Sequence, residues 1–319
     1  MRCITLTCFI ILLIPILTLV LTGLRYSTSQ SSDSLWINAF YSSILPTKSP
    51  LLLPRYKRDL DKHFKSNWKE IRSEFLSYTT KAPPLNNYTN MWNYTGWGTI
   101  PLSIYNKPLP TISTHFPLTL NLANAAGPDV VSVMFSVLQP GGSISPHTGD
   151  FKGVARYHLG LEVPKYEGKE WRRSEFLPDG GLWAPVRLGI YGKGTLKEVR
   201  DSVRGGNKVD DVEVMEWTEG ESILWDDTFP HFAENLTKER RVVLFVDVVR
   251  GDLPRWARWV TRWVVRGVGP RIPLVEEWAR WNEIQWGRHN GIGDEGGDEE
   301  GEEGGKEEGG GNRRQHDEI

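Results

Sequence analysis

Three of the seven histidines lie where side chains could bind a metal ion. His147 follows the Pro-Gly-Gly at 140–142, His158 lies in an apolar run typical of a strand, and His231 follows the acidic pair of Asp-Asp-Thr-Phe-Pro. Imidazoles presented from separate strands of a β-barrel are suitable ligands for Fe(II). A single histidine is more often a structural or exposed residue, so each of these needs support from its sequence context.

The sequence lacks the third ligand of the common ferrous site. That site combines two histidines with one carboxylate, which normally comes two residues after the first histidine. Gly149 stands at that position here, and Asp150 comes one residue later. On a strand Asp150 would point to the opposite face, so it would reach the site only through an irregular turn. Taken from the residues alone, a neutral pair of histidines weakens the case for a metal.

Two blocks of sequence resemble the aspartyl/asparaginyl β-hydroxylase family. Residues 136–161 read SVLQPGGSISPHTGDFKGVARYHLGL, and residues 217–248 contain WTEGE, DDTFPH, Arg241 and FVDV. Both are similar to the core signature of the family, which also has glycine in place of the missing carboxylate. Asp150 departs from the signature, where proline is usual. Residues 67–74 resemble the leading helix of the family, so the resemblance covers roughly 67–250.

The resemblance implies a dioxygenase that uses Fe(II), 2-oxoglutarate and O2. His147 and His231 would be the iron ligands. The neighbouring Asp226 and Asp227 would either form the turn by hydrogen bonding or orient a ligand histidine.

The resemblance also implies a binding site for the cosubstrate. Arg241 would pair with the distal carboxylate of 2-oxoglutarate, and Ser136 would hydrogen-bond to it. A guanidinium suits this role because its planar fork binds a carboxylate through two hydrogen bonds. Arg156 and His158 would point into the same cavity, two residues apart on one strand face, and bind the carboxylate end of the cosubstrate or the substrate.

The spacing of apolar residues predicts helices before and after a β domain. Residues 53–80 carry Leu60, Phe64, Trp68, Ile71 and Phe75 at helical spacing, and 86–117 are expected to be loop with short strands. Strands are predicted at 130–138, 153–163, 182–191, 212–217, 222–225 and 241–248, with a turn at 140–142. The pattern predicts a mainly β fold: a double-stranded β-helix, jelly-roll or cupin-like, with flanking helices and an N-terminal transmembrane helix.

Residues 171–211 make the chain between His158 and His231 longer than the family pattern. We expect a loop or an extra hairpin at the mouth of the barrel. Because insertions at a mouth alter access, the substrate is not carried over from the family.

The ends of the chain predict a location in the secretory pathway. Residues 4–21 are apolar and long enough to cross a bilayer. Of the two cysteines, Cys8 lies within this run and Cys3 directly before it. We favour an uncleaved signal anchor over a cleaved signal peptide. Asn87, Asn93 and Asn235 fit the N-glycosylation pattern. The final HDEI resembles the H-D-E-L retrieval signal. We expect a single-pass type II protein of the endoplasmic reticulum membrane with a luminal catalytic domain.

The sequence predicts five parts along the chain. A membrane is an expected partner. Nucleic acid is not, because the net charge is only -2. Residues 254–287 are rich in Arg and Trp, and form either a helix covering the barrel or a basic amphipathic face lying on a membrane. The parts are the anchor at 1–24, a stalk at 25–52, the dioxygenase domain at 53–253, the helical segment at 254–287, and a disordered acidic, Gly-rich tail at 288–319.

Three functions remain open from the sequence. The first is hydroxylation of Asp or Asn side chains in secretory-pathway proteins, giving succinate and CO2. The second is hydroxylation of a lipid on the same scaffold. The third is a non-catalytic, membrane-anchored interaction protein. The presence of His147, His231, Arg156, His158 and Arg241 together argues against it, because a protein without turnover has no reason to keep cosubstrate contacts.

Overall fold

The computed structural model describes most of the chain between Leu35 and Arg280. The described residues are 35–45, 49–51, 54–80, 95–149, 151–165, 174, 176–177, 185–207, 211–271, 273, 275–277 and 279–280. The predicted anchor, two of the three glycosylation sites, Asp150 and the acidic tail lie outside them. Within these ranges no helix is both long and apolar enough to cross a membrane.

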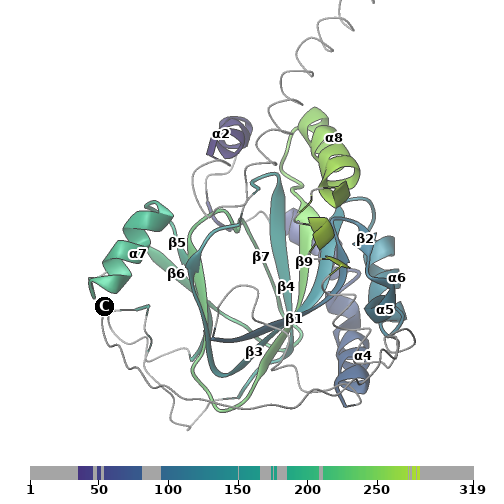
Figure 1. Ribbon diagram of the computed structural model, residues 1–319, viewed down its shortest axis with the longest axis horizontal. Coiled ribbons are helices and arrows are strands. Elements are labelled where there is room, and N and C mark those ends of the chain that lie inside the picture. The colour runs from purple at the N-terminus through teal and green to yellow at the C-terminus, as the bar shows by residue number, and fades with distance from the viewer. Residues whose placement is uncertain are drawn as a thin grey trace, which may run out of the picture.

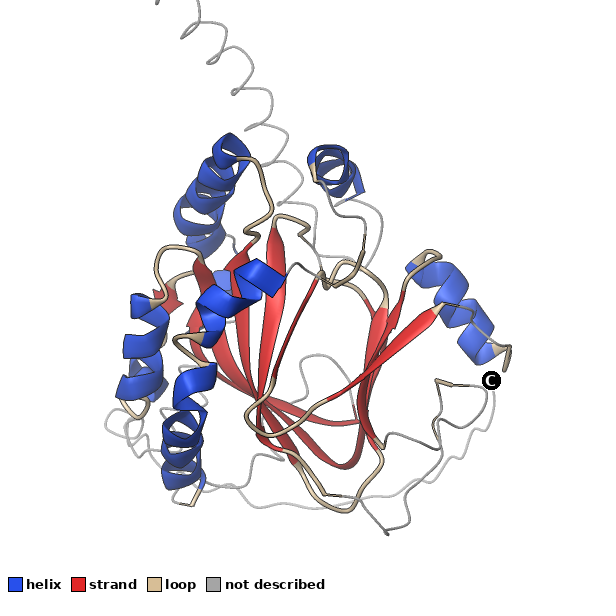
Figure 2. Cartoon of the chain, turned by 180° about the vertical axis from the view of Figure 1, so that it is seen from behind, coloured by secondary structure: helices blue, strands red, loops and turns tan. Residues whose placement is uncertain are grey.

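A single antiparallel sheet forms the centre of the molecule and is bent so that its two ends face each other (Figure 2). The strand order is β6-β5-β8-β3-β9-β4-β7, and β1 pairs with both β3 and β2. The strands are β1 (Thr95–Ile104), β2 (Lys107–Pro108), β3 (Val130–His147), β4 (Val154–Glu162), β5 (Val186–Tyr191), β6 (Val212–Glu216), β7 (Ser222–Trp225), β8 (His231–Asn235) and β9 (Arg241–Val249). The mainly β prediction is confirmed.

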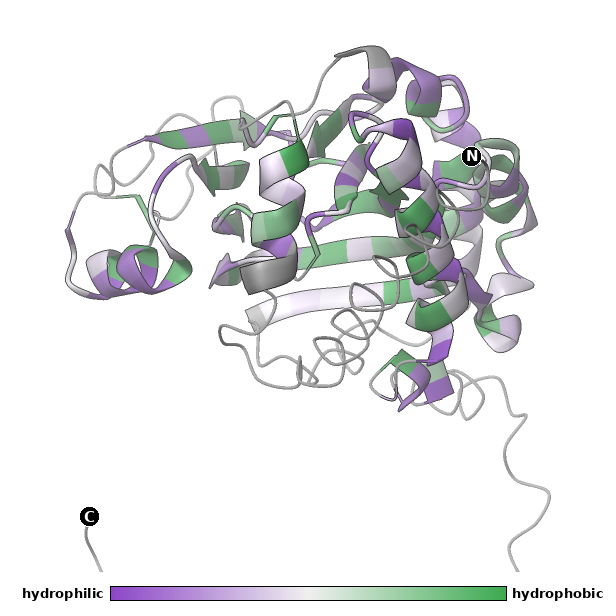
Figure 3. Cartoon of the chain, turned by 90° about the horizontal axis from the view of Figure 1, so that it is seen from above, coloured by the Kyte–Doolittle hydropathy of each residue, from purple (hydrophilic) through white to green (hydrophobic). Residues whose placement is uncertain are grey.

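Helices cover the outside of this sheet (Figure 1). They carry both polar and apolar residues, whereas the strands are mostly apolar (Figure 3). The helices are α2 (Leu35–Ile44), α3 (Pro54–Asp61), α4 (Trp68–Thr79), α5 (Pro110–Ser113), α6 (Pro117–Ala125), α7 (Leu196–Arg204) and α8 (Arg255–Trp263), with short helical turns at Lys65–Asn67, Val264–Val268 and Gly269–Arg271.

The predicted turn at 140–142 is wrong, because these residues lie within the long strand β3. Its first part pairs with β9 and β1, and its last residues pair with β8. The chain bends within the strand instead of turning back, and Gly141 has a φ of 69°. A Cβ on Gly142 would lie 2.9 Å from the carbonyl oxygen of Gln139 and 3.0 Å from that of Gly96. The glycines therefore allow a close approach of two backbones within a continuous strand.

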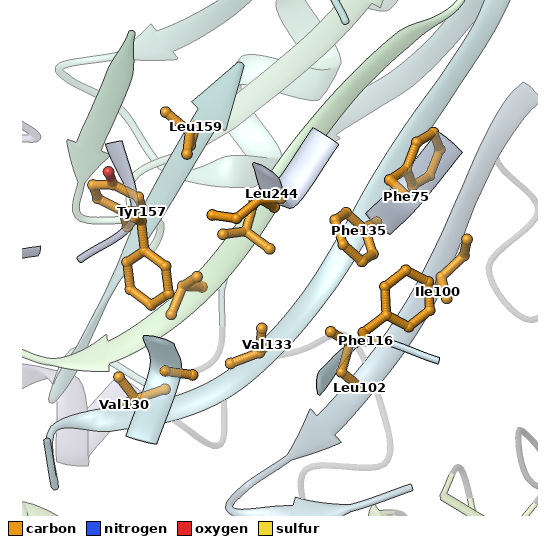
Figure 4. Close-up of a cluster of buried hydrophobic side chains, with 14 of the residues drawn as sticks. Phe75, Ile100, Leu102, Phe116, Val130, Val133, Phe135, Tyr157, Leu159 and Leu244 are labelled. Atoms are coloured by element: carbon orange, nitrogen blue, oxygen red, sulfur yellow. The ribbon is translucent and has the colours of Figure 1, made fainter. Parts of the chain in front are cut away.

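The main hydrophobic core lies between the sheet and the helices. The rings of Phe75 on α4 and Phe116 before α6 pack on Phe135 of β3, with centroids 5.2 and 4.9 Å away (Figure 4). Apolar residues at every second position of β3, β4 and β9 belong to this core. Since side chains alternate along a strand, the residues between them face the interior of the bend. Those inward residues include Ser136, Arg156, His158 and Arg241.

The predicted helix at 53–80 is interrupted. The chain forms α3 and α4 with the helical turn at Lys65–Asn67 between them. Leu60, Phe64, Ile71 and Phe75 are nevertheless all buried in the core, while Trp68 is only half-buried. The helical spacing therefore identified the buried face but missed the break.

Two parts of the sequence prediction need correction. Part of the predicted stalk forms α2, and Tyr41 and Leu45 of this region pack in a cluster with residues of β9 and α8. Asn235 is fully buried, and its side-chain nitrogen lies 2.7 to 3.1 Å from three backbone carbonyl oxygens. A glycan needs this nitrogen exposed, so Asn235 is not a glycosylation site in the folded protein.

Candidate metal and carboxylate site

His147 and His231 face each other across β3 and β8. They are partners in the strand register, and their ring centroids lie 4.1 Å apart. Each Nδ1 lies 2.9 Å from the carbonyl oxygen two residues earlier, that of Ser145 and of Phe229. A carbonyl only accepts hydrogen bonds, so each Nδ1 carries the proton and each Nε2 is the unprotonated nitrogen. Both rings thus present the atom that binds a metal.

Both histidines are held in the neutral form. Burial lowers the pKa of His147 to about 4, and the positive charges of Arg156 and Arg200 act in the same direction against the hydrogen bond to Ser145. Burial lowers the pKa of His231 well below its ordinary value, with His147 as the next cause. Because only neutral imidazole ligates a metal, the pair is ready for an ion at neutral pH.

Asp227 occupies the space next to Gly149. A Cβ at position 149 would lie 2.0 Å from a carboxylate oxygen of Asp227, and the amide of Gly149 donates to the backbone oxygen of Asp227 at 2.7 Å. Among the described residues, no group of three or more His, Cys, Asp or Glu is placed to hold a metal. The donor set therefore fits an ion bound by two histidines, with its remaining positions open to other ligands.

Asp226 and Asp227 have different surroundings. Asp226 accepts from the Thr228 backbone at 3.1 Å and is paired with Lys152 at 3.1 Å and with Arg250, which is turn and packing chemistry. Asp227 is paired with Arg156 at 2.9 Å and lies beside the residue two positions after His147. Of the two carboxylates, Asp227 is the one that lies against Gly149, two residues after the candidate ligand His147.

Arg241 is a buried cation without a carboxylate partner among the described residues. It is 1% exposed, its guanidinium stacks on Trp217 at 4.4 Å, and its Nε has no hydrogen-bond partner in the described part of the chain. Burial lowers its pKa to about 9. Burying an unpaired charge is strongly unfavourable, so this guanidinium is placed to receive an anion.

Ser136 adds a donor beside Arg241. Its hydroxyl oxygen accepts from Trp97 Nε1 at 2.9 Å and from an Arg241 Nη at 3.4 Å. A serine hydroxyl has two acceptor positions and one hydrogen, so its own O–H is left to donate. Ser136 and Arg241 together offer donors that suit a carboxylate.

His158 links the two histidines to this anion site. It is buried, neither ring nitrogen has a partner among the described residues, and burial lowers its pKa well below the ordinary value. Its ring lies 4.5 Å from Trp225 and 6.0 Å from Trp217, and Trp225 in turn lies 6.1 Å from His231. Buried nitrogens without partners indicate a place for a polar ligand.

Arg156 has a structural partner set of its own. It pairs with Asp227 at 2.9 Å and Asp247 at 3.0 Å and stacks on Phe245 at 4.2 Å. It therefore holds Asp227 beside Gly149. Its expected role in binding a carboxylate of the cosubstrate or substrate stays a prediction.

The insertion after His158 brings a further cation to the site. Antiparallel strands β5 and β6 flank α7, as a hairpin would, and α7 begins with a capping box between Thr195 and Glu198. Arg200 on α7 donates from Nε to the backbone oxygen of Pro146 at 2.9 Å, next to His147. Sequence reasoning missed Arg200, Trp97 and the contact between Asp227 and Gly149, because no local pattern connects residues that meet only through the sheet.

Both histidine blocks lie within segments that match a known protein family. The family model for aspartyl/asparaginyl beta-hydroxylase matches residues 65–175 and 202–251, together just over half of the chain. The unmatched residues between these segments include all of β5 and the start of α7.

Two relatives carry related names. The ornithine lipid ester-linked acyl 2-hydroxylase of Rhizobium tropici is 31% identical over 150 residues, 47% of this chain and 40% of that protein. The mouse (Mus musculus) aspartyl/asparaginyl beta-hydroxylase is 25% identical over 228 residues, 69% of this chain and 26% of that protein. The matches thus span less than half of each relative.

Among solved structures, HygX from Streptomyces hygroscopicus, crystallised with nickel and 2-oxoglutarate, aligns over 57% of this chain and 79% of its own, with 9% identity and a TM-score of 0.37. That likeness is too slight to carry an argument. The match of the family model does not depend on it. With its two histidine blocks inside the matched segments, the chain belongs to the aspartyl/asparaginyl β-hydroxylase family.

Proposed function

We propose that the protein is an Fe(II)- and 2-oxoglutarate-dependent hydroxylase. The observation that carries the proposal is the buried, unpaired guanidinium of Arg241, joined by buried aromatic rings to two neutral histidines. A pair of histidine ligands alone would suit many metalloproteins. Two histidine ligands beside an anion site suit a cosubstrate that binds the metal at one end and a cation at the other.

Two groups of residues would bind the metal ion and the cosubstrate. His147 and His231 would hold the iron through Nε2, and Arg241 and Ser136 would bind the distal carboxylate of 2-oxoglutarate. Bound iron, O2 and 2-oxoglutarate supply the oxidation of an unactivated carbon, while the protein supplies orientation and electrostatics. Trp217 and Trp225 are buried and contact His158, so they lie between the two ends.

Succinate release by the purified full chain, with and without added Fe(II), tests the proposal. We expect release that depends on iron and is lost in His147→Ala. Turnover without iron, or an unchanged rate and unchanged iron binding in His147→Ala, would contradict the assignment of ligands. Absence of any turnover with iron bound would favour the non-catalytic interaction protein.

For the substrate, we propose Asp or Asn side chains of secretory-pathway proteins. The description of the matched family and the name of the mouse relative support it. Arg200 supports it as well, because a guanidinium beside His147 suits an acidic substrate. The apolar residues 4–21 and the final HDEI support a type II location in the endoplasmic reticulum membrane, with the catalytic domain in the lumen.

A lipid substrate is the second candidate. The name of the Rhizobium tropici relative supports it, and so do three exposed tryptophans on α8. Hydroxylation assays with an EGF-like peptide and with a lipid extract, followed by mass spectrometry of both, distinguish the two candidates.

A further inference from the structure

Four large apolar side chains gather on one exposed face made by α8 and α2. Trp256, Trp259 and Trp263 are 48%, 59% and 44% exposed, and Phe40 is 37% exposed. The tryptophans follow a spacing of three and then four residues, which places them on one side of a helix. Phe40 joins them through an edge contact with Trp256, at 6.3 Å between centroids. We call these four residues the tryptophan face.

The helix that carries this face is firmly attached to the domain. Its opposite side is buried at Ala257 and Thr261, and Tyr41 of α2 hydrogen-bonds to Thr261 at 2.8 Å. Arg258 and Arg262 form ion pairs with Asp129. The tryptophans are thus presented outward by a fixed element. A grouped apolar surface on a fixed element marks an interaction site.

The charge around the tryptophan face is positive. The sequence of α8, RWARWVTRW, contains no acidic residue, and α2 contains no charged residue at all. Arg258 and Arg262 are engaged with Asp129, whereas Arg255 and Arg266 are exposed. An apolar face bordered by cations is complementary to anionic lipid head groups.

The predicted anchor would bring a bilayer close to this face. Residues 4–21 are apolar and long enough to cross a membrane, and the thirteen residues between them and α2 reach at most ~45 Å. Tryptophan is the side chain that gathers at membrane–water boundaries, where an indole meets both hydrocarbon and polar groups. We propose that the tryptophan face docks on the surface of an anionic lipid bilayer.

Docking would also fix the orientation of the candidate site relative to the membrane surface. Phe151, close after His147, packs on Tyr41 of α2 at 5.1 Å, and the backbone of Lys152 donates to Asn38 at 2.8 Å. The segment that follows a metal ligand therefore lies directly under the docking elements. If the proposed hydroxylase function holds, its substrate is at the membrane surface; the docking itself does not depend on that function.

Spin labelling of the full chain tests the docking. In a Cys3→Ser, Cys8→Ser background, one nitroxide label is placed at Trp259→Cys and, separately, a control label at Lys197→Cys on the distant helix α7. The protein is reconstituted into phosphatidylcholine vesicles with and without phosphatidylglycerol. Relaxation of each label by oxygen, which partitions into lipid, is compared with relaxation by a water-soluble nickel chelate.

We expect the label at 259 to be protected from nickel and open to oxygen in the anionic vesicles, and the label at 197 to remain open to nickel. Trp256→Ser with Trp263→Ser should reduce this protection. Arg255→Gln with Arg266→Gln should lower the docked-to-undocked ratio in anionic vesicles by about fivefold per arginine. All four residues are exposed, so the fold should survive both changes.

Two results would overturn the proposal. One is equal access of nickel to the label at 259 with and without lipid. The other is protection at 259 in detergent without lipid, together with a short distance between labels on two chains, which would make the face a contact between copies. Neither result depends on succinate release, so loss of docking and loss of catalysis are told apart.

Discussion

Gly149 stands where the usual ferrous triad has a carboxylate, and it lies against the carboxylate of Asp227. At the position two residues after His147, even a methyl group would collide with its oxygens. Gly149 is therefore required by a contact between residues far apart in the chain. What looked like a defect of the motif becomes, in the structure, room for a carboxylate from the other histidine block.

Gly149→Ala tests this contact. The added methyl must displace Asp227 and, with it, the partner of Arg156, so we expect weaker Fe(II) binding and at least tenfold slower succinate release, about 1.4 kcal/mol. Gly267→Ala is the matched control, because its Cβ would meet nothing closer than 4.0 Å. Equal iron binding in Gly149→Ala and wild type would show that the position of Asp227 is unimportant.

Arg241→Leu should have opposite effects on binding and stability. Loss of a charge-assisted contact should raise the KM for 2-oxoglutarate by roughly ten- to a hundredfold, about 1.5–3 kcal/mol. In the absence of cosubstrate the variant should be as stable as wild type or more so, because an unpaired buried charge is removed. Kinetics and thermal unfolding of the same preparation measure both.

Arg187→Leu is the control for that pair of measurements. Arg187 is equally buried, but it pairs with the fully buried Glu234 at 2.9 Å. Breaking a buried pair leaves an uncompensated charge and should destabilise the fold by about 3–5 kcal/mol. If Arg241→Leu lowered the unfolding temperature as much as Arg187→Leu, the anion-site assignment of Arg241 would be wrong.

Among the elements, α7 is the one that the family match only partly covers. Arg200→Ala should lower kcat/KM for an acidic peptide substrate roughly tenfold, since a charge-assisted hydrogen bond contributes about 1.5–3 kcal/mol. Turnover of 2-oxoglutarate without substrate should not change. Arg204→Ala, an exposed change one turn along the same helix, is the control. Equal losses in both variants would indicate a general effect of α7.

Helix α8 is held by Asp129. Burial raises the pKa of this carboxyl, but hydrogen bonds and charges from Arg262 and Arg258 outweigh it and lower the pKa below its ordinary value. A lowered folded-state pKa gives stability that is present at neutral pH and lost as the pH falls through that lowered value. Asp129→Asn should speed hydrogen exchange in α8 at neutral pH. Unchanged exchange would show that buried apolar contacts alone hold the helix.

Strands with a clear apolar or alternating pattern were predicted, and those that are short or interrupted by glycine and proline were predicted poorly. Arg156 and His158 could be placed on one strand face in advance from their two-residue spacing, whereas Arg241 was named from the resemblance to the family. Strand β8 was not predicted because HFAEN is short and half polar. Strand β1 lies in the region expected to be loop with short strands, and its length was missed because TGWGTIPLSI contains two glycines and a proline. The partners of Ser136 and Gly149 could not be predicted, since they depend on the pairing of β3 with β1 and β8.

At the scale of the whole molecule, the bent sheet separates two environments. Its helix-covered side is an apolar core, and its inner side collects the polar residues of both histidine blocks. The tryptophan face lies beside the segment that follows His147. The apolar core and the candidate site therefore lie on opposite sides of the sheet, and the proposed membrane contact lies on helices α8 and α2.

The central claim is that an iron ion held by His147 and His231, together with the anion site at Arg241, binds one molecule of 2-oxoglutarate. Anaerobic titration calorimetry of 2-oxoglutarate into the protein, with and without Fe(II), tests it most directly. We expect binding that is much tighter with iron, and weakened by both His147→Ala and Arg241→Leu. Equal affinity with and without iron, or binding that survives both variants, would contradict the account.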